Sequence, residues 1–145
     1  MAKMSSVGLE DLAFASNKFT LDLLGILREE EEKNIFYSPS SLSVALAMTY
    51  LGAKENTAQQ LAKALNWDKI PAEELHSQMK LFLSSVQAAN TDKTELAMAN
   101  RHFLQKDFDI VQEFKTNTAK FYGAEMALVD YKNDPEGARQ EVKKL

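Results

Sequence analysis

The chain has 145 residues, of which 45% are hydrophobic and 26% are charged, and it carries a formal net charge of −4 at pH 7. This composition is typical of a folded globular domain and argues against general disorder. The 17 basic residues are dispersed along the chain, which argues against a nucleic-acid-binding face, and the absence of cysteine excludes disulfides and zinc–thiolate sites.

The first expected element is a helix over Leu9–Leu27, because apolar residues recur there at helical spacing. The acidic run at 29–32 that follows is expected to be a solvated loop, since consecutive carboxylates do not have the spacing of cation ligands. The expected buried stripe of the helix consists of Leu12, Phe19, Leu23 and Ile26, widened by Phe14, Leu21 and Leu24.

The central stretch predicts a short strand followed by a helix. Ile35–Tyr37 is a β-rich run, and Ser38-Pro39 ends it and starts the helix, because proline fits the first helical turn but not a strand interior. From Leu42 to Leu51 the helix is apolar on nearly every face, which predicts that it is buried on all sides. Gly52 is expected to end it.

Two further helices are expected before residue 90. Asn56 and Gln59 resemble a capping box that opens the first of them, and Trp67 is expected to pack back as an anchor. Pro71 starts the second, over Ala72–Ala88. The outer face of that helix is expected to carry Glu73, Glu74, Gln78 and a single lysine, Lys80.

The remainder predicts a strand–helix–strand unit and a last helix. Strands are expected over Glu95–Leu104 and Ala124–Tyr131, with a helix over Ile110–Tyr122 that Gly123 closes. This order implies two parallel strands joined by a right-handed crossover. Asp134-Pro135 is expected to cap the last helix, with Ala138, Val142 and Leu145 on one face.

No constellation of catalytic, metal-binding or cofactor-binding residues is predicted, so the chain is not expected to be an enzyme. His76 is expected at the surface and His102 packed against backbone, because neither has a nucleophile or carboxylate in a suitable context. The serines at 38, 41 and 43 lack a nucleophile motif, and their hydroxyls are expected to satisfy backbone groups at the helix N-terminus.

The chain is expected to be the N-terminal portion of a larger domain, for two reasons. The strand at 34–38 has no evident partner, and the helix that starts near Pro135 has no C-cap signal before Leu145.

Several motifs in order resemble the serpin family. The strongest is Asn34–Leu65; the others are 99–103 (A-N-R-H-F, where the family pattern is A-N-R-L-F), 121–124 and 134–139. The resemblance is greatest to the intracellular, ovalbumin-like group. It implies a mixed α+β serpin fold, of which residues 1–145 would supply about five helices, the start of a sixth, one short buried strand and two strands of the large sheet.

The resemblance also implies a function. Serpins inhibit serine or cysteine proteases by offering a reactive loop, which after cleavage inserts as a strand into the large sheet of a metastable fold. That loop lies near the family's C-terminus, so no reactive-site bond is expected here. The alternatives are a non-inhibitory serpin with a carrier, chaperone or storage role, or a truncated fragment without inhibitory activity.

The implied partners are a target protease and the remaining C-terminal part of the serpin, with no cofactor, metal, nucleic acid or membrane. Heparin is not expected to bind, because the helix Ala72–Ala88 lacks the basic face of heparin-activated members. The start of the chain has no secretory signal, and no glycosylation sequon occurs. These features favour a cytoplasmic protein; it would be extracellular if secreted unconventionally or if a signal had been removed.

The candidate site implied by the resemblance is the shutter, the region where the large sheet opens. Many family members have an asparagine where this chain has Lys143, so either the alignment shifts by one residue there or the hydrogen-bond network is altered. The shutter residues are Asn34, Ser38, Pro39, Ser41, Leu42, Asn100 and Lys143.

Overall fold

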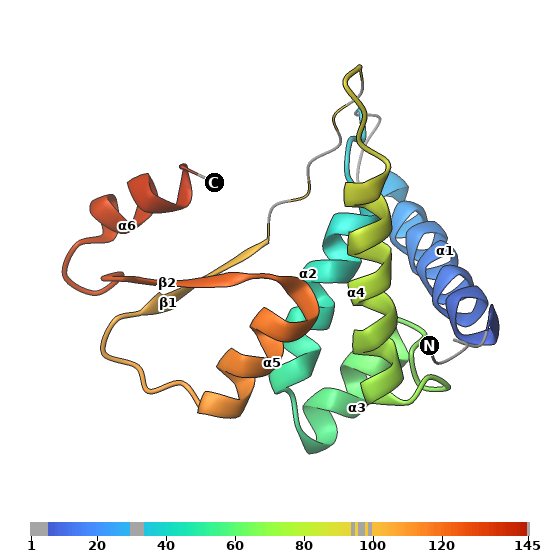
Figure 1. Ribbon diagram of the computed structural model, residues 1–145, viewed down its shortest axis with the longest axis horizontal. Coiled ribbons are helices and arrows are strands. Elements are labelled where there is room, and N and C mark those ends of the chain that lie inside the picture. The colour runs from blue at the N-terminus through green and yellow to red at the C-terminus, as the bar shows by residue number, and fades with distance from the viewer. Residues whose placement is uncertain (1–5, 30–33, 94, 96–97, 99, 145) are drawn as a thin grey trace. The chain divides into compact units, whose positions relative to one another are not determined.

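The computed structural model describes residues 6–29, 34–93, 95, 98 and 100–144 (Figure 1). The chain forms two compact units, Met1–Phe82 and Leu83–Leu145. The first contains the helices α1 (Ser6–Glu29), α2 (Pro39–Gly52), α3 (Glu55–Ala64) and most of α4 (Ala72–Ala88). The second contains β1 (Arg101–Gln105), α5 (Gln112–Tyr122), β2 (Glu125–Val129) and α6 (Pro135–Val142).

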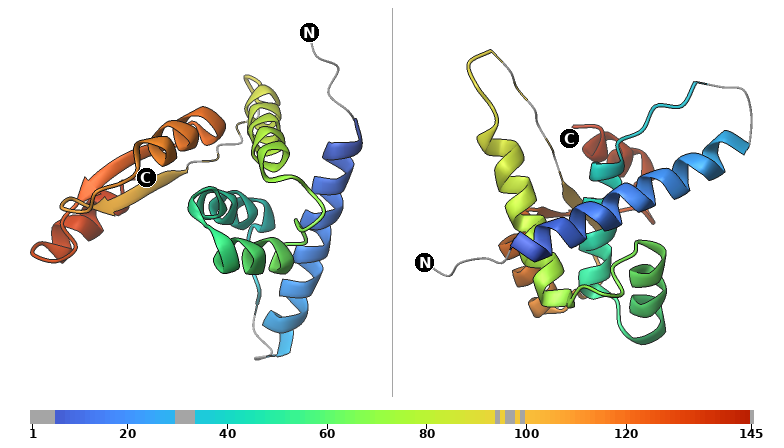
Figure 2. Two further views of the ribbon diagram at one scale, coloured as in Figure 1. Left: turned by 90° about the horizontal axis from the view of Figure 1, so that it is seen from below. Right: turned by 90° about the vertical axis from the view of Figure 1, so that its right-hand side faces the viewer.

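The N-terminal half of α1 lies against α2 and α4 (Figure 2). Side chains of these three helices line a hollow of about 200 Å³. Leu12 and Ala15 of α1 are buried, and Phe19 and Leu23 are half-buried. The buried stripe is narrower than the sequence predicted: Phe14, Leu21 and Ile26 are exposed by 70, 68 and 60%. None of the helices in the described part of the chain is long and apolar enough to cross a bilayer.

The start of α2 confirms the prediction made from Ser38-Pro39. Pro39 is the first helical residue, and Ser38 is an N-cap whose side chain accepts a hydrogen bond from the Ser41 backbone. The prediction that this helix is buried on all sides is wrong for this chain, because Leu42 and Ala45 are exposed. The buried residues of α2 are Ser43, Val44, Ala47 and Met48.

The strand predicted over Ile35–Tyr37 is not present. Residues 34–38 form no regular element, because a strand needs a hydrogen-bonding neighbour and the described residues provide none here. Phe36 is fully exposed and Ile35 is 38% exposed. The segment is attached through Tyr37, whose hydroxyl donates a hydrogen bond of 3.0 Å to the Thr20 carbonyl of α1.

Trp67 is 1% exposed, which confirms the prediction that it packs back as an anchor. The predicted capping box of α3 is wrong, because the N-cap is Lys54 and no side-chain hydrogen bond caps the helix. The bounds of α4 agree with the prediction, but Gln78, expected on its outer face, is buried. The Gln78 amide donates a hydrogen bond of 3.0 Å to the Glu74 carboxylate, one turn earlier.

His76, expected at the surface, is also buried on α4, with 5% of its area exposed. Its ring lies 5.8 Å from the ring of Tyr50, which in turn lies 5.7 Å from Trp67. Burial lowers the pKa of His76 from 6.5 to about 4, so the ring is neutral at pH 7. Helix periodicity alone did not reveal this burial, because the covering residue, Tyr50, comes from another helix.

The second unit confirms the predicted parallel pair of strands. β1 pairs with β2 from Arg101 opposite Glu125 to Gln105 opposite Val129. Both strands are shorter than predicted, and β1 begins at Arg101 rather than at Glu95. The predicted strand positions Leu96, Ala97 and Ala99 lie outside the described residues. Arg101 and His102 lie within the predicted strand and are part of β1.

A hydrogen-bond network centred on Asp130 closes the C-terminal end of the two strands. The Asp130 carboxylate pairs with Lys106 at 2.8 Å, and it accepts hydrogen bonds from the Gln105 side chain and the Asn133 backbone. The hydrogen bond to Lys106, followed by the one from the Asn133 backbone, holds the pKa of Asp130 well below its usual range. The stabilisation is therefore present at neutral pH and is lost as the pH falls below about 4.

The ends of α5 and α6 follow the predicted rules. Gly123 caps α5 in the left-handed conformation, with φ of +58°. Asp134 caps α6 by accepting a hydrogen bond of 2.9 Å from the Gly137 backbone. Ala138 is buried, as predicted, whereas Val142 is 40% exposed; Leu145 lies outside the described residues.

Substituting Gly123 with alanine should lower the free energy of unfolding by about 1–2 kcal/mol, because a side chain is strained at positive φ. Gly25→Ala in α1 is the matched control, since a β-carbon at either glycine meets nothing within 4 Å. This control should be neutral or stabilising by about 0.5–1 kcal/mol. Urea unfolding followed by circular dichroism compares the two; equal effects would show that backbone strain at Gly123 is not the cause.

Candidate functional site

The best-defined part of the predicted shutter is the first turn of α2. The Ser38 hydroxyl accepts a hydrogen bond of 3.3 Å from the Ser41 backbone and donates one of 3.0 Å to the Ser41 hydroxyl. The Leu42 backbone donates a hydrogen bond of 3.1 Å to the Ser38 carbonyl, which closes the first helical turn. Ser38, Pro39, Ser41 and Leu42 are therefore brought together by one helix N-terminus.

These residues form a surface rather than a buried network in this chain. Ser38 and Ser41 are exposed, as is Asn34, which precedes them in the irregular segment. Leu42 is 39% exposed, a large fraction for a leucine on the second turn of a helix. The hydroxyl pair satisfies the helix N-terminus, as the sequence predicted. Among the residues that the structure describes, it has no hydrogen bond to a histidine or carboxylate that would make it a nucleophile.

The other two predicted shutter residues belong to the second unit. Asn100 immediately precedes β1 and is half-buried. Lys143 is exposed at the C-cap of α6, where its backbone donates a hydrogen bond of 3.2 Å to the Arg139 carbonyl. The structure therefore divides the seven shutter residues into a set around the start of α2 and two residues of the second unit.

The two faces of β1 carry side chains of different kinds: Arg101 and Phe103 are on one face, and His102 is on the other. Arg101 pairs with Glu125 across the two strands at 3.3 Å, and its guanidinium lies 5.7 Å from the centre of the Phe103 ring. The neighbouring residue, His102, points to the opposite face by strand alternation. Its ring lies 5.5 Å from that of Phe114 in α5, at an interplanar angle of 58°.

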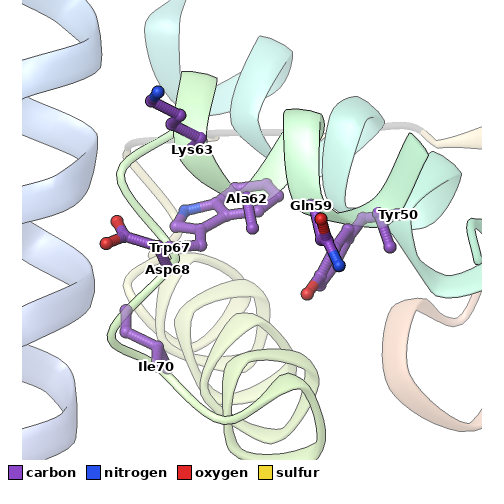
Figure 3. Close-up of a pocket in the computed structure, with 8 residues that line it drawn as sticks. Tyr50, Gln59, Ala62, Lys63, Trp67, Asp68 and Ile70 are labelled. Carbon is purple, nitrogen blue, oxygen red and sulfur yellow. The ribbon is translucent and has the colours of Figure 1, made fainter. Parts of the chain in front are cut away.

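A hollow in the first unit lies between α2, α3 and the segment that leads to α4, and has a volume of about 460 Å³ (Figure 3). Its apolar lining is Tyr50, Ala58, Ala62, Trp67 and Ile70, and its polar lining is Gln59, Lys63 and Asp68. In Figure 3 the charged ends of Lys63 and Asp68 point away from the indole ring rather than over it. The polar groups therefore do not converge on one point, which a specific ligand site requires.

Metal chemistry finds no support in the part of the chain that the structure describes. The described residues contain no group of three or more histidine, aspartate or glutamate side chains that could hold a metal ion. His102 was expected within the strand Glu95–Leu104, but its contact with Phe114 of α5 was not predicted. The signal that could have indicated this contact is the two-residue alternation of His102 with Leu104, which places both on one face of the strand.

Comparison with known proteins gives a consistent match. A family model described as serpin (serine protease inhibitor) matches residues 14–145. Leukocyte elastase inhibitor A from Rattus norvegicus is 39% identical over 135 residues, which cover 92% of this chain and 35% of that protein. Human Serpin B4 is 34% identical over 148 residues, which cover 92% of this chain and 38% of that protein. The chain thus spans about a third of the length of these curated relatives.

Solved structures show the same fold. Emu ovalbumin superposes with a TM-score of 0.85 at 24% identity, covering 92% of this chain and 38% of that one. Human thyroxine-binding globulin in complex with its ligand gives a TM-score of 0.83 at 25% identity, covering 94% of this chain and 37% of that one. The six helices and the two parallel strands described above therefore correspond to part of a larger known architecture.

Replacing Ser38 with alanine should destabilise the chain by about 1 kcal/mol, because the N-terminus of α2 loses its side-chain cap. Ser41→Ala is the matched control: it removes a hydroxyl of the same pair but leaves the capping interaction in place. Its effect should stay within about 0.5 kcal/mol. Thermal unfolding of both variants measures the difference; similar losses would mean that the hydroxyl pair, and not the cap, is what matters.

Proposed function

The chain belongs to the serpin family, and we propose that residues 1–145 form the N-terminal part of a single serpin domain that inhibits endopeptidases. The observation that carries this proposal is the family match over residues 14–145 together with relatives that include a leukocyte elastase inhibitor. The family description and that relative favour serine proteases as targets, with cysteine proteases as a second class.

The proposed mechanism is cleavage of a reactive loop followed by its insertion into the large sheet. The loop would lie in the C-terminal part of the domain, so the present chain would contribute no reactive bond and no catalytic residue. Its contribution would be β1 and β2 as two strands of the large sheet. In the described part of the chain each strand pairs only with the other, which leaves an outer edge on both for further strands.

Exposed apolar residues support the view that further polypeptide covers these units. Phe36 is fully exposed, Leu128 of β2 is 63% exposed, and Leu42 of α2 is 39% exposed. Large apolar side chains at a sheet and at the start of a core helix are typical of surfaces that pack against other elements.

We also propose that Asn34, Ser38, Pro39, Ser41 and Leu42 join Asn100 and Lys143 as the shutter once the domain is complete. The support is the position of the first five at the start of α2 and of Asn100 beside β1. The resemblance places Lys143 where many family members have an asparagine, so either the alignment shifts by one residue there or the hydrogen-bond network of the shutter is altered.

Two alternatives have specific support. A carrier role is favoured by the likeness to thyroxine-binding globulin, and it would make the protein a non-inhibitory serpin. A fragment without inhibitory activity is favoured by the coverage of only about a third of the relatives. The proposed location is cytoplasmic, supported by the match to human Serpin B4, with an extracellular location as the alternative; heparin, nucleic acid and membranes are not proposed as partners.

The test is incubation of the natural-length protein with elastase-like serine proteases and with papain-like cysteine proteases, followed by denaturing gel electrophoresis. The expected result is a protease–inhibitor complex that survives denaturation, together with a released C-terminal peptide. The 145-residue chain alone is the control and should form no such complex. Absence of any complex across the panel would favour the carrier role, and a complex with the control would contradict the proposed place of the loop.

A further inference from the structure

His102 lies in β1 at a position where a change in its charge would affect both the neighbouring strand β2 and the helix α5. It lies opposite Met126 of β2 in the parallel register, and its ring packs on Phe114 of α5. The same side chain therefore contributes to the contact between the sheet and the helix that connects its two strands.

Next to this contact along the chain, β1 and α5 each carry a buried polar atom without a hydrogen-bond partner among the described residues. One is Nε2 of His102, and the other is Oγ1 of Thr118, which lies one helical turn after Phe114. Thr118 is completely buried. Unsatisfied polar atoms already weaken such a contact, and an imidazolium would add a buried charge to it.

Among the described residues of β1, β2 and α5, no charged side chain pairs with His102. In β1 the adjacent Arg101 is on the other face and is a cation, and in β2 the carboxylate of Glu125 is already paired with Arg101. In α5, Phe114 contacts the His102 ring, and Thr118 is buried one helical turn later; both are uncharged. The charged residues of α5 are exposed: Glu113, Lys115 and Lys120.

We infer that His102 is a pH-sensitive contact, which holds α5 on β1 while the ring is neutral and loosens that contact when the ring is protonated. Burial lowers the pKa of His102 from 6.5, which is the direction expected for a ring whose charged form is disfavoured. Opening of the contact exposes the ring and lets it bind a proton. The protection of α5 and β1 is therefore complete above about pH 6.5 and decreases as the pH falls below that value.

A consequence for the sheet rests on the proposed function. If β1 and β2 belong to a sheet that gains a strand, then acid would loosen the helix that joins them and ease rearrangement of that edge. The pH response does not require inhibitory activity. The outcome of its test is therefore independent of the outcome of the protease test.

The test is hydrogen–deuterium exchange of the full chain at pH 7.5 and pH 5.5, with intrinsic exchange rates corrected. Protection of residues 101–105 and 112–122 should fall about three- to tenfold in the wild type, since one titrating group can change an equilibrium by at most about tenfold per pH unit. His102→Leu and His102→Gln cannot be protonated and should each show no such fall. His76→Gln is the matched control: it removes the only other histidine and should leave the fall unchanged.

Persistence of the fall in both His102 variants, or its absence in the wild type, would overturn the inference. A second measurement needs no variant. Histidine ring NMR of the wild type should show the His102 ring titrating below the ordinary value, and a ring that titrates at about 6.5 would equally overturn it.

Discussion

The parallel pairing of β1 with β2 is the constraint on which the second unit depends. Parallel strands cannot be joined by a tight turn, so α5 must connect them, and the chain must reverse at Gly123 to bring β2 beside β1. The positive φ of Gly123 and the Asp130 network fix the two ends of this arrangement. A two-stranded sheet is only marginally stable by itself, so its packing against α5 and its free edges are both important for what the domain can do.

The sequence correctly predicted those helix ends that depend only on residues close by in the chain. Ser38-Pro39 starts α2, Gly123 ends α5 and Asp134 caps α6, and in each case one residue supplies a conformation or a hydrogen bond that its neighbours need. Some predictions that depend on contacts with residues far away in the chain were wrong. The strand at 34–38 is absent without a neighbour, and His76 is buried by Tyr50 of a different helix.

In the candidate site, too, the local features could be predicted from the sequence and the features that depend on distant contacts could not. The hydroxyl pair of Ser38 and Ser41 was predictable as a capping arrangement, because capping acts within four residues. Whether Asn100 and Lys143 join that pair depends on contacts between the two units, which no spacing in the sequence specifies. The environment of His102 was also unpredictable, since its contact with Phe114 arises from the crossover of α5. The family match therefore identifies the fold, but it does not predict the side-chain contacts between β1 and α5.

The central claim is that these two units are part of a larger serpin domain, and mass spectrometry of the natural protein under native and denaturing conditions tests it most directly. We expect the native species to contain, besides residues 1–145, further polypeptide equal to about two thirds of a relative's length. That polypeptide would be either covalently continuous or tightly held. A native species consisting of the 145-residue chain alone, unfolding cooperatively as a monomer, would contradict the claim.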